Sequence, residues 1–64
     1  MPERLADPVM TTKEAAEYLK LSVRTLLRLR VDGGGPAAAK IGRQWRYRRS
    51  QLDAWLAERE REGQ

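Results

Sequence analysis

The chain has 64 residues and contains neither cysteine nor histidine, which excludes disulfides, thiolate metal sites and catalysis by a histidine base. Its net charge of +4 hides a strong segregation: residues 20–49 carry nine basic side chains and one acid, and the residues on both sides are net acidic. Such a region attracts polyanions, although charge alone also fits a solvated face without a partner. A chain this short buries only about 60% of its unfolded surface, which predicts one small domain without a cofactor.

The N-terminal residues show no membrane or export signal. No apolar run approaches the ~20 residues needed to span a bilayer, and residues 1–10 lack the apolar core of a signal peptide. We therefore expect a cytoplasmic protein without a membrane partner. Residues 1–9 contain two prolines and three charged side chains, so we expect a flexible leader followed by a folded domain over residues 10–62.

Two helices separated by a very short connector are predicted at the start of this domain. Thr11 and Glu14 fit a capping box, in which each side chain accepts a hydrogen bond from the other residue's backbone N–H, and Thr12 is an alternative cap. Ser22 is a good N-cap for the second helix. Two helices joined by so few residues cross steeply, which is the helix-turn-helix geometry.

The second helix is predicted to have an aliphatic inner face and a cationic outer face. At about 100° per residue, Leu26 and Leu29 point one way. Arg24, Arg28 and Val31 point the opposite way, with Leu27 on their flank. This helix should therefore pack through its leucines and present its arginines to solvent or to a partner.

A glycine loop and a β-hairpin are predicted next. Three consecutive glycines and Pro36 cannot continue a helix. The runs at residues 37–41 and 45–48 flank a short gap that contains glycine, which is typical of a hairpin. We expect Ile41 to meet Trp45 across the strands. The tip should present Arg43 and Gln44, with Lys40 and Arg46 beside it.

A third helix should begin at Ser50, with Asp53 completing a second capping box. The whole chain is therefore predicted to be mostly α with a small β-hairpin, as a winged helix-turn-helix. We expect Trp45 and Trp55 to lie in the core rather than to form a base-stacking platform. Tyr47 is a weaker core candidate, because its hydroxyl must stay hydrated or hydrogen-bonded.

Four blocks of the sequence, in this order, resemble the excisionase-family DNA-binding domain. They read TTKEAAEYL at residues 11–19, LSVRTL at 21–26, KIGRQWRY at 40–47 and QLDAWL at 51–56. That family has the winged-helix fold of MerR-like regulators. The resemblance implies that the second helix enters the DNA major groove and that the hairpin touches the minor groove or backbone. Residues 32–36 depart from the family's usual basic, less glycine-rich link.

Arginine suits the outer face of the second helix, because its planar fork can bind guanine O6 and N7 together, or a phosphate. Ser22 is better explained as a helix cap than as a direct DNA contact. For Thr25, a structural role and a contact to a DNA phosphate are equally favoured. Leu27 could touch a thymine methyl or, as we slightly favour, pack beneath the wing. The predicted DNA-binding residues are Ser22, Arg24, Thr25, Arg28, Lys40, Arg43, Gln44 and Arg46.

We expect a sequence-specific binder of double-stranded DNA that controls excision by architectural binding. A chain of this size has no room for a sensor domain, which favours that role. Its expected partners besides DNA are an integrase and further copies of itself on adjacent sites. The alternatives are a small transcriptional regulator, a single-strand or RNA binder, and an adaptor that docks through Leu52, Trp55 and Leu56. An enzyme is not expected, because no nucleophile–base pair is present.

Overall fold

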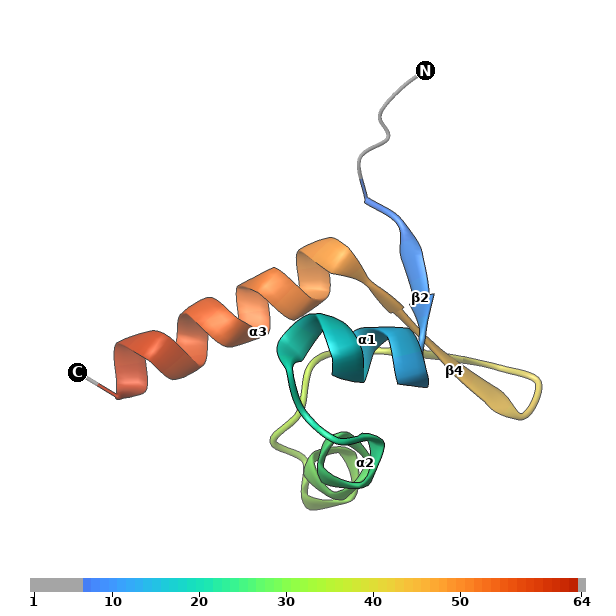
Figure 1. Cartoon of the computed structure of the whole chain (residues 1–64), viewed down its shortest axis with the longest axis horizontal. Helices are drawn as coiled ribbons and strands as arrows, with labels where there is room; N and C mark the ends of the chain where they lie inside the picture. The colour runs from blue at the N-terminus through green and yellow to red at the C-terminus, as the bar shows by residue number, and fades with distance from the viewer. Residues whose placement is uncertain (1–6, 64) are drawn as a thin grey trace.

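The computed structural model describes residues 7–63, which form three helices and a three-stranded antiparallel sheet (Figure 1). The elements in chain order are β2 (Val9–Thr11), α1 (Thr12–Leu19), α2 (Val23–Asp32), β3 (Ala39–Ile41), β4 (Gln44–Arg48) and α3 (Arg49–Glu62). The predicted winged helix-turn-helix is confirmed, with the β3–β4 hairpin as its wing. None of the described helices is long and apolar enough to cross a membrane.

The helix-turn-helix pair is capped as predicted. The Thr11 hydroxyl accepts from the Glu14 N–H at 3.1 Å, and the Glu14 carboxylate accepts from the Thr11 N–H at 2.9 Å. Lys20 ends α1 in the left-handed region, at φ 61°. Ser22 then caps α2 by accepting from the Thr25 N–H at 3.0 Å. In Figure 1, α1 lies across the view while α2 is seen end-on, so the two helices cross steeply.

The hairpin has a different register from the predicted one. Ile41 pairs with Gln44 and Lys40 pairs with Trp45, so the expected contact between Ile41 and Trp45 is wrong by one residue. The reason is a two-residue turn whose first residue, Gly42, has φ 66°. Turn length sets register in a hairpin, and a shift of one residue moves each side chain to the other face. Ile41 is consequently exposed, and Lys40 shares a face with Trp45.

The sheet contains a third strand that the sequence did not predict. Strand β2 pairs with β4, with Val9 opposite Arg48 and Met10 opposite Tyr47. Of the expected leader, residues 1–6 lie outside the described residues, whereas Val9 belongs to the sheet. A strand of three residues is too short to show an alternating pattern of apolar and polar side chains. It can be recognised only in the tertiary structure, from its pairing with β4.

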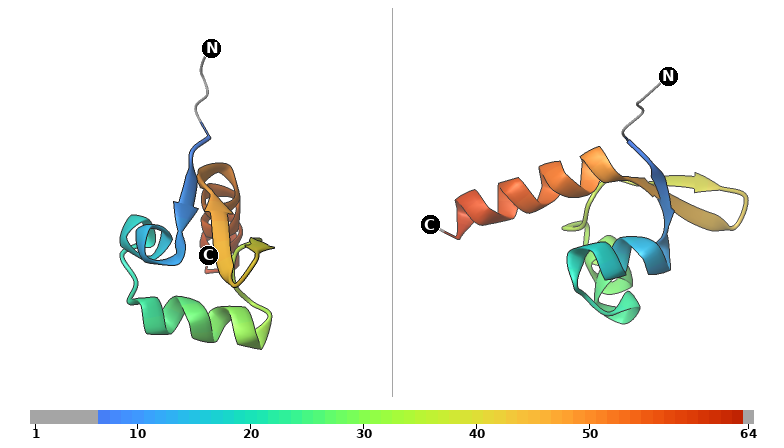
Figure 2. Two further views of the ribbon diagram at one scale, coloured as in Figure 1. Left: turned by 90° about the vertical axis from the view of Figure 1, so that its right-hand side faces the viewer. Right: turned by 45° about the horizontal axis from the view of Figure 1, so that its top comes forward.

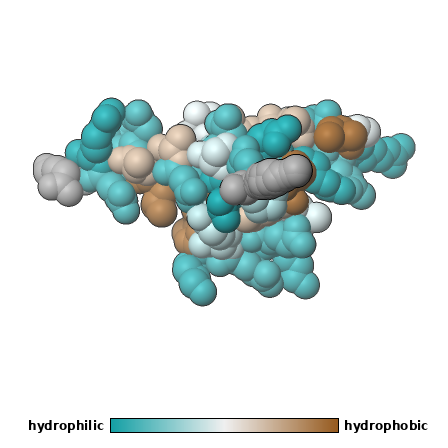
Figure 3. All heavy atoms as spheres, turned by 90° about the horizontal axis from the view of Figure 1, so that it is seen from above, coloured by the Kyte–Doolittle hydropathy of each residue, from teal (hydrophilic) through white to brown (hydrophobic). Residues whose placement is uncertain are grey.

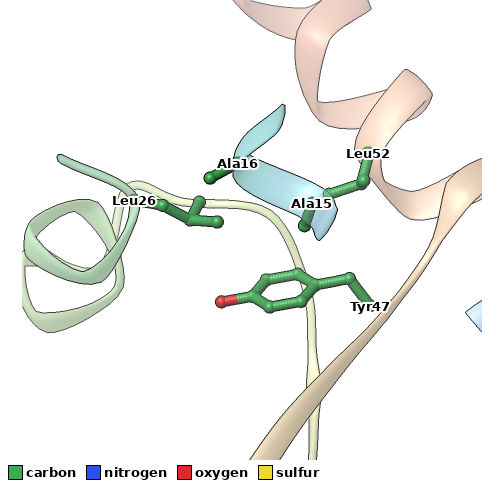
Figure 4. Close-up of a cluster of buried hydrophobic side chains, with 5 residues drawn as sticks. All are labelled: Ala15, Ala16, Leu26, Tyr47 and Leu52. Atoms are coloured by element: carbon green, nitrogen blue, oxygen red, sulfur yellow. The ribbon is translucent and has the colours of Figure 1, made fainter. Parts of the chain in front are cut away.

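The hydrophobic core is a cluster of five buried side chains from α1, α2, β4 and α3 (Figure 4): Ala15, Ala16, Leu26, Tyr47 and Leu52. The expectation that both tryptophans lie in the core holds only in part: Trp45 is half-buried and packs against this cluster, whereas Trp55 is half-buried and is not among the residues packed against it. Tyr47 is fully buried instead, with its hydroxyl directed toward Leu26 and without a hydrogen-bond partner among the described residues. Alanines on α1 leave space for this one aromatic ring.

The N-cap of α3 is Arg48, two residues earlier than the predicted Ser50, and the capping side chain comes from a distant segment. Arg48 is the N-cap residue and provides no side-chain cap, so the expected Ser50–Asp53 capping box is wrong. The Asp7 carboxylate accepts from the Ser50 N–H at 2.7 Å and from the Ser50 hydroxyl at 2.9 Å. Asp53 instead accepts a 2.6 Å hydrogen bond from the Tyr18 hydroxyl and so links α3 to α1.

Candidate nucleic-acid interface

One side of α2 faces solvent along its whole length. Leu26 is fully buried and holds the opposite side against the core. Arg24 and Arg28, one helical turn apart, are both exposed. Within residues 7–63, neither guanidinium forms an ion pair, a hydrogen bond or a ring contact. In Figure 2, left, α2 runs along the lower edge of the molecule and the wing lies beside its C-terminal end. These two arginines are therefore open to an external anion or base.

Ser22 and Thr25 lie in the first turn of this helix and are hydrogen-bonded to each other. Besides accepting from the Thr25 backbone, Ser22 Oγ lies 2.9 Å from Thr25 Oγ1. The predicted capping role of Ser22 is confirmed. Both residues remain exposed at a helix N-terminus, where the aligned peptide dipoles favour negative charge.

The four predicted wing residues do not share one surface. Lys40 lies on the face of the hairpin that carries Trp45, with its ammonium 5.7 Å from the indole centre. Gln44 and Arg46 lie on the opposite face, where their side chains are hydrogen-bonded to each other. Arg43 is exposed in the turn and contacts no described residue through a polar or ring interaction. The wing therefore offers a cation at its tip and one on each face.

Arg46 is more constrained than the sequence suggested. Its guanidinium is half-buried, and Nη1 donates to the Trp45 carbonyl oxygen at 3.0 Å. With Nη2 on Gln44, the side chain lies along its own strand rather than projecting from it. Arg46 is therefore better suited to contact the DNA backbone from a fixed position than to recognise a particular base.

Arg30 connects α2 to the wing, a role that the sequence did not indicate. Its guanidinium carbon lies 3.3 Å from the centre of the Trp45 ring, a stacked cation–π contact. The contact fixes the position of β4 relative to α2. Arg30 is half-buried at the edge of the inner face, and only the tertiary structure brings the indole of Trp45 beside it.

The glycine loop anchors the other end of α2. Gly33 ends the helix with φ 83°, and the Gly34 N–H donates to the Leu29 carbonyl at 3.0 Å. A Cβ at Gly35 would lie 3.3 Å from the backbone of Leu29 and Arg30, so this close approach favours glycine. The Gly34 carbonyl also accepts a 2.6 Å hydrogen bond from the Trp55 indole. The two tryptophans thus attach the end of α2 to the wing and to α3.

An open groove between the start of α1 and the wing tip adds a residue that sequence reasoning missed. Its lining includes Thr12 and Lys13 on one side and Arg43 and Arg46 on the other. These residues are about thirty positions apart in the chain. Lys13 is exposed and adds a cation to the same end of the molecule as the wing tip. Its signal in the sequence was only an isolated lysine in a predicted first turn.

The comparison with family models agrees with this geometry. The model described as a helix-turn-helix domain matches residues 9–60, which is most of the chain. The search of curated proteins returned no match. The matched region contains the steeply crossed α1–α2 pair, the wing and most of α3. The chain therefore belongs to the helix-turn-helix domain family, a family of proteins that bind double-stranded DNA.

Proposed function

We propose that this protein is a sequence-specific DNA-binding protein of the excisionase type, which controls site-specific recombination by architectural binding. The observation that supports the proposal most strongly is that Arg24 and Arg28, which have no partner within residues 7–63, lie beside a basic wing. The finer role rests on the resemblance of four sequence blocks, in order, to the excisionase family. An integrase and further copies of the chain on adjacent sites are the partners that this role requires.

In the proposed complex, α2 lies in the major groove, which is about 12 Å wide and admits one helix. Arg24 and Arg28 bind guanine edges or phosphates there through their planar forks. Ser22 and Thr25, at the positive end of the helix, lie near a backbone phosphate. The wing contacts the adjacent backbone or minor groove, with Arg43 at its tip, Lys40 and Arg46 on its two faces, and Gln44 holding Arg46 in place.

The binding mode is tested by a gel-shift experiment with a duplex selected from a random library. We expect the duplex to compete much better than either of its single strands. Arg24→Ala and Arg28→Ala should each weaken the selected complex. Equal binding of parent and both variants would disprove the role of α2. Preference for a single strand would indicate an RNA or single-strand binder instead.

The alternative role is transcriptional regulation through the same DNA contacts. A circular-permutation assay for bending, together with an integrase-dependent excision assay, separates the two roles. We expect bent DNA and a change in excision when the gene is deleted. Unchanged excision with altered transcripts of neighbouring genes would favour the regulator.

An adaptor that docks through α3 has less support. Leu52 is fully buried, and Trp55 is half-buried with its indole N–H on Gly34. Leu56 alone of the three proposed anchors is exposed. Seen from above, hydrophilic side chains cover most of the visible surface, and apolar ones form small separate patches (Figure 3).

A further inference from the structure

The solvent face of α2 carries aliphatic side chains as well as arginines. Leu27 is 42% exposed and Val31 is 86% exposed, the highest value among the large apolar residues that the structure describes. They are four residues apart and therefore lie side by side on the helix. We call this pair the aliphatic stripe. Packing of Leu27 beneath the wing, the favoured expectation, stays a prediction, and the exposed 42% of this residue is available to a partner.

The stripe lies between the two arginines and the wing. Arg30 marks the side of α2 that faces the wing, because it stacks on Trp45. Going around the helix at about 100° per residue, Leu27 and then Val31 follow Arg30, and Arg24 comes next. A DNA duplex that contacts both the arginines and the wing would therefore also contact the aliphatic stripe, which lies between them.

We propose that Leu27 and Val31 recognise thymine, by packing against its 5-methyl group in the major groove. This inference rests on the proposed function. The thymine methyl is the apolar group that a base pair presents in that groove. A partner covering the stripe must also lie against Arg24, which has no counter-charge among the described residues, and DNA supplies that charge. The bound sequence should therefore place thymine next to the bases or phosphates that the arginines contact.

The test replaces each thymine of the selected duplex, one at a time, with deoxyuridine. Deoxyuridine pairs with adenine in the same way but lacks the methyl group. We expect the parent protein to lose about threefold to tenfold in affinity at one or two positions, which is the range for removing one buried methyl contact. Leu27→Ala or Val31→Ala should bind the thymine and deoxyuridine duplexes equally at the matching position.

Leu56→Ala is the matched control, because Leu56 on α3 is also a leucine with 42% exposure. It should retain the full sensitivity to deoxyuridine. Leu27 and Val31 are exposed, so their alanine variants should remain folded, and thermal unfolding of each variant verifies this. Val31→Thr, which keeps the shape of the side chain, should lower the sensitivity less than Val31→Ala.

The outcomes separate this inference from the function on which it rests. If the duplex binds in an Arg24-dependent manner and no deoxyuridine weakens it, the thymine inference is overturned and the proposed function stands. If no duplex is preferred over single strands, both are overturned. If Leu27→Ala changes the sedimentation of the free protein while deoxyuridine has no effect, the stripe is a contact between copies of the chain and does not read thymine.

Discussion

Two helices of this protein carry arginines, and they use them differently. On α3, Arg59 lies 3.5 Å from Glu62 and Arg61 lies 3.3 Å from Glu58, so each charge is neutralised within one turn. On α2, Arg24 and Arg28 have no such partner among the described residues. Exposed pairs such as those on α3 contribute little to stability, and their main effect is to cancel the local field. The comparison shows that α2, unlike α3, keeps its charge available to an external anion.

The same helices also begin differently. Helix α2 is capped by its own Ser22, whereas α3 depends on Asp7, which is 43 residues away in the chain. Both have a tryptophan contact to an arginine, but Arg30 lies 3.3 Å from the Trp45 ring centre and Arg59 lies 5.8 Å from that of Trp55. The start of α2 is thus stabilised by its own neighbouring residue Ser22, and its end is held by the close stacking of Arg30 on Trp45.

The largest expected effect is on the salt dependence of DNA binding. If about five or six cations of α2 and the wing contact phosphates, log affinity should fall with log salt at a slope near −5. Between 50 and 200 mM salt this slope corresponds to a loss of roughly a thousandfold. Binding isotherms at several salt concentrations measure it. A slope close to −1 would contradict a phosphate-contacting surface of this size.

Alanine substitutions on the two helices test the comparison directly. We expect Arg24→Ala and Arg28→Ala each to weaken DNA binding by roughly 1–3 kcal/mol, because each removes a contact to a base or phosphate. Arg59→Ala and Arg61→Ala remove the same charge from α3 and should change binding by less than about 0.5 kcal/mol. Equal losses from the two helices would show that only net charge matters.

Arg30 should matter for stability and for the placement of the wing. Arg30→Ala removes the stack on Trp45, and we expect the free energy of unfolding to fall by roughly 0.5–2 kcal/mol. Arg59→Ala, which removes the longer contact to Trp55, should cost less. Urea unfolding followed by tryptophan emission measures both.

Arg30→Lys separates positioning from charge. It keeps the charge but loses the planar stack, so it should weaken DNA binding while the salt slope stays unchanged. A lysine variant that binds DNA like the parent would leave Arg30 with a purely structural role.

The two caps should differ in their response to pH. Ser22→Ala should cost about 1 kcal/mol at any pH, because a hydroxyl cap does not titrate. Hydrogen bonds from the backbone N–H of Ser50 and then from its hydroxyl lower the pKa of Asp7 most; desolvation opposes them, and Arg48 and Arg49 lower the pKa further by smaller amounts. A lowered pKa in the folded state stabilises the protein above the unfolded value of about 4, and this stability is lost as pH falls through the folded value.

Asp7→Asn should therefore lower stability at pH 7 and have a smaller effect at pH 3, where the parent carboxylate is also becoming protonated. Urea unfolding at both pH values measures the difference. A loss that is identical at pH 7 and pH 3 would show that the charge of Asp7 does not contribute.

The sequence by itself determined the local features of this protein. Thr11, Glu14 and Ser22 identified the starts of α1 and α2, because these caps involve residues only three positions apart, whereas the same kind of pattern at Ser50 and Asp53 failed for α3. The spacing of Leu26 from Arg24 and Arg28 separated the buried side of α2 from its exposed side, since the helical period is fixed. The order of helices, loop and hairpin followed from these signals together with the glycines.

Only the tertiary structure decided the features that depend on distant partners. Asp7 caps α3, Arg30 stacks on Trp45 and β2 joins the sheet, and in each case the contacting residues lie more than ten positions apart. The choice of Tyr47 rather than the tryptophans for the core depended on how closely the alanines of α1 approach the sheet. Short-range patterns do not encode such distances, because they arise only when all the elements pack together.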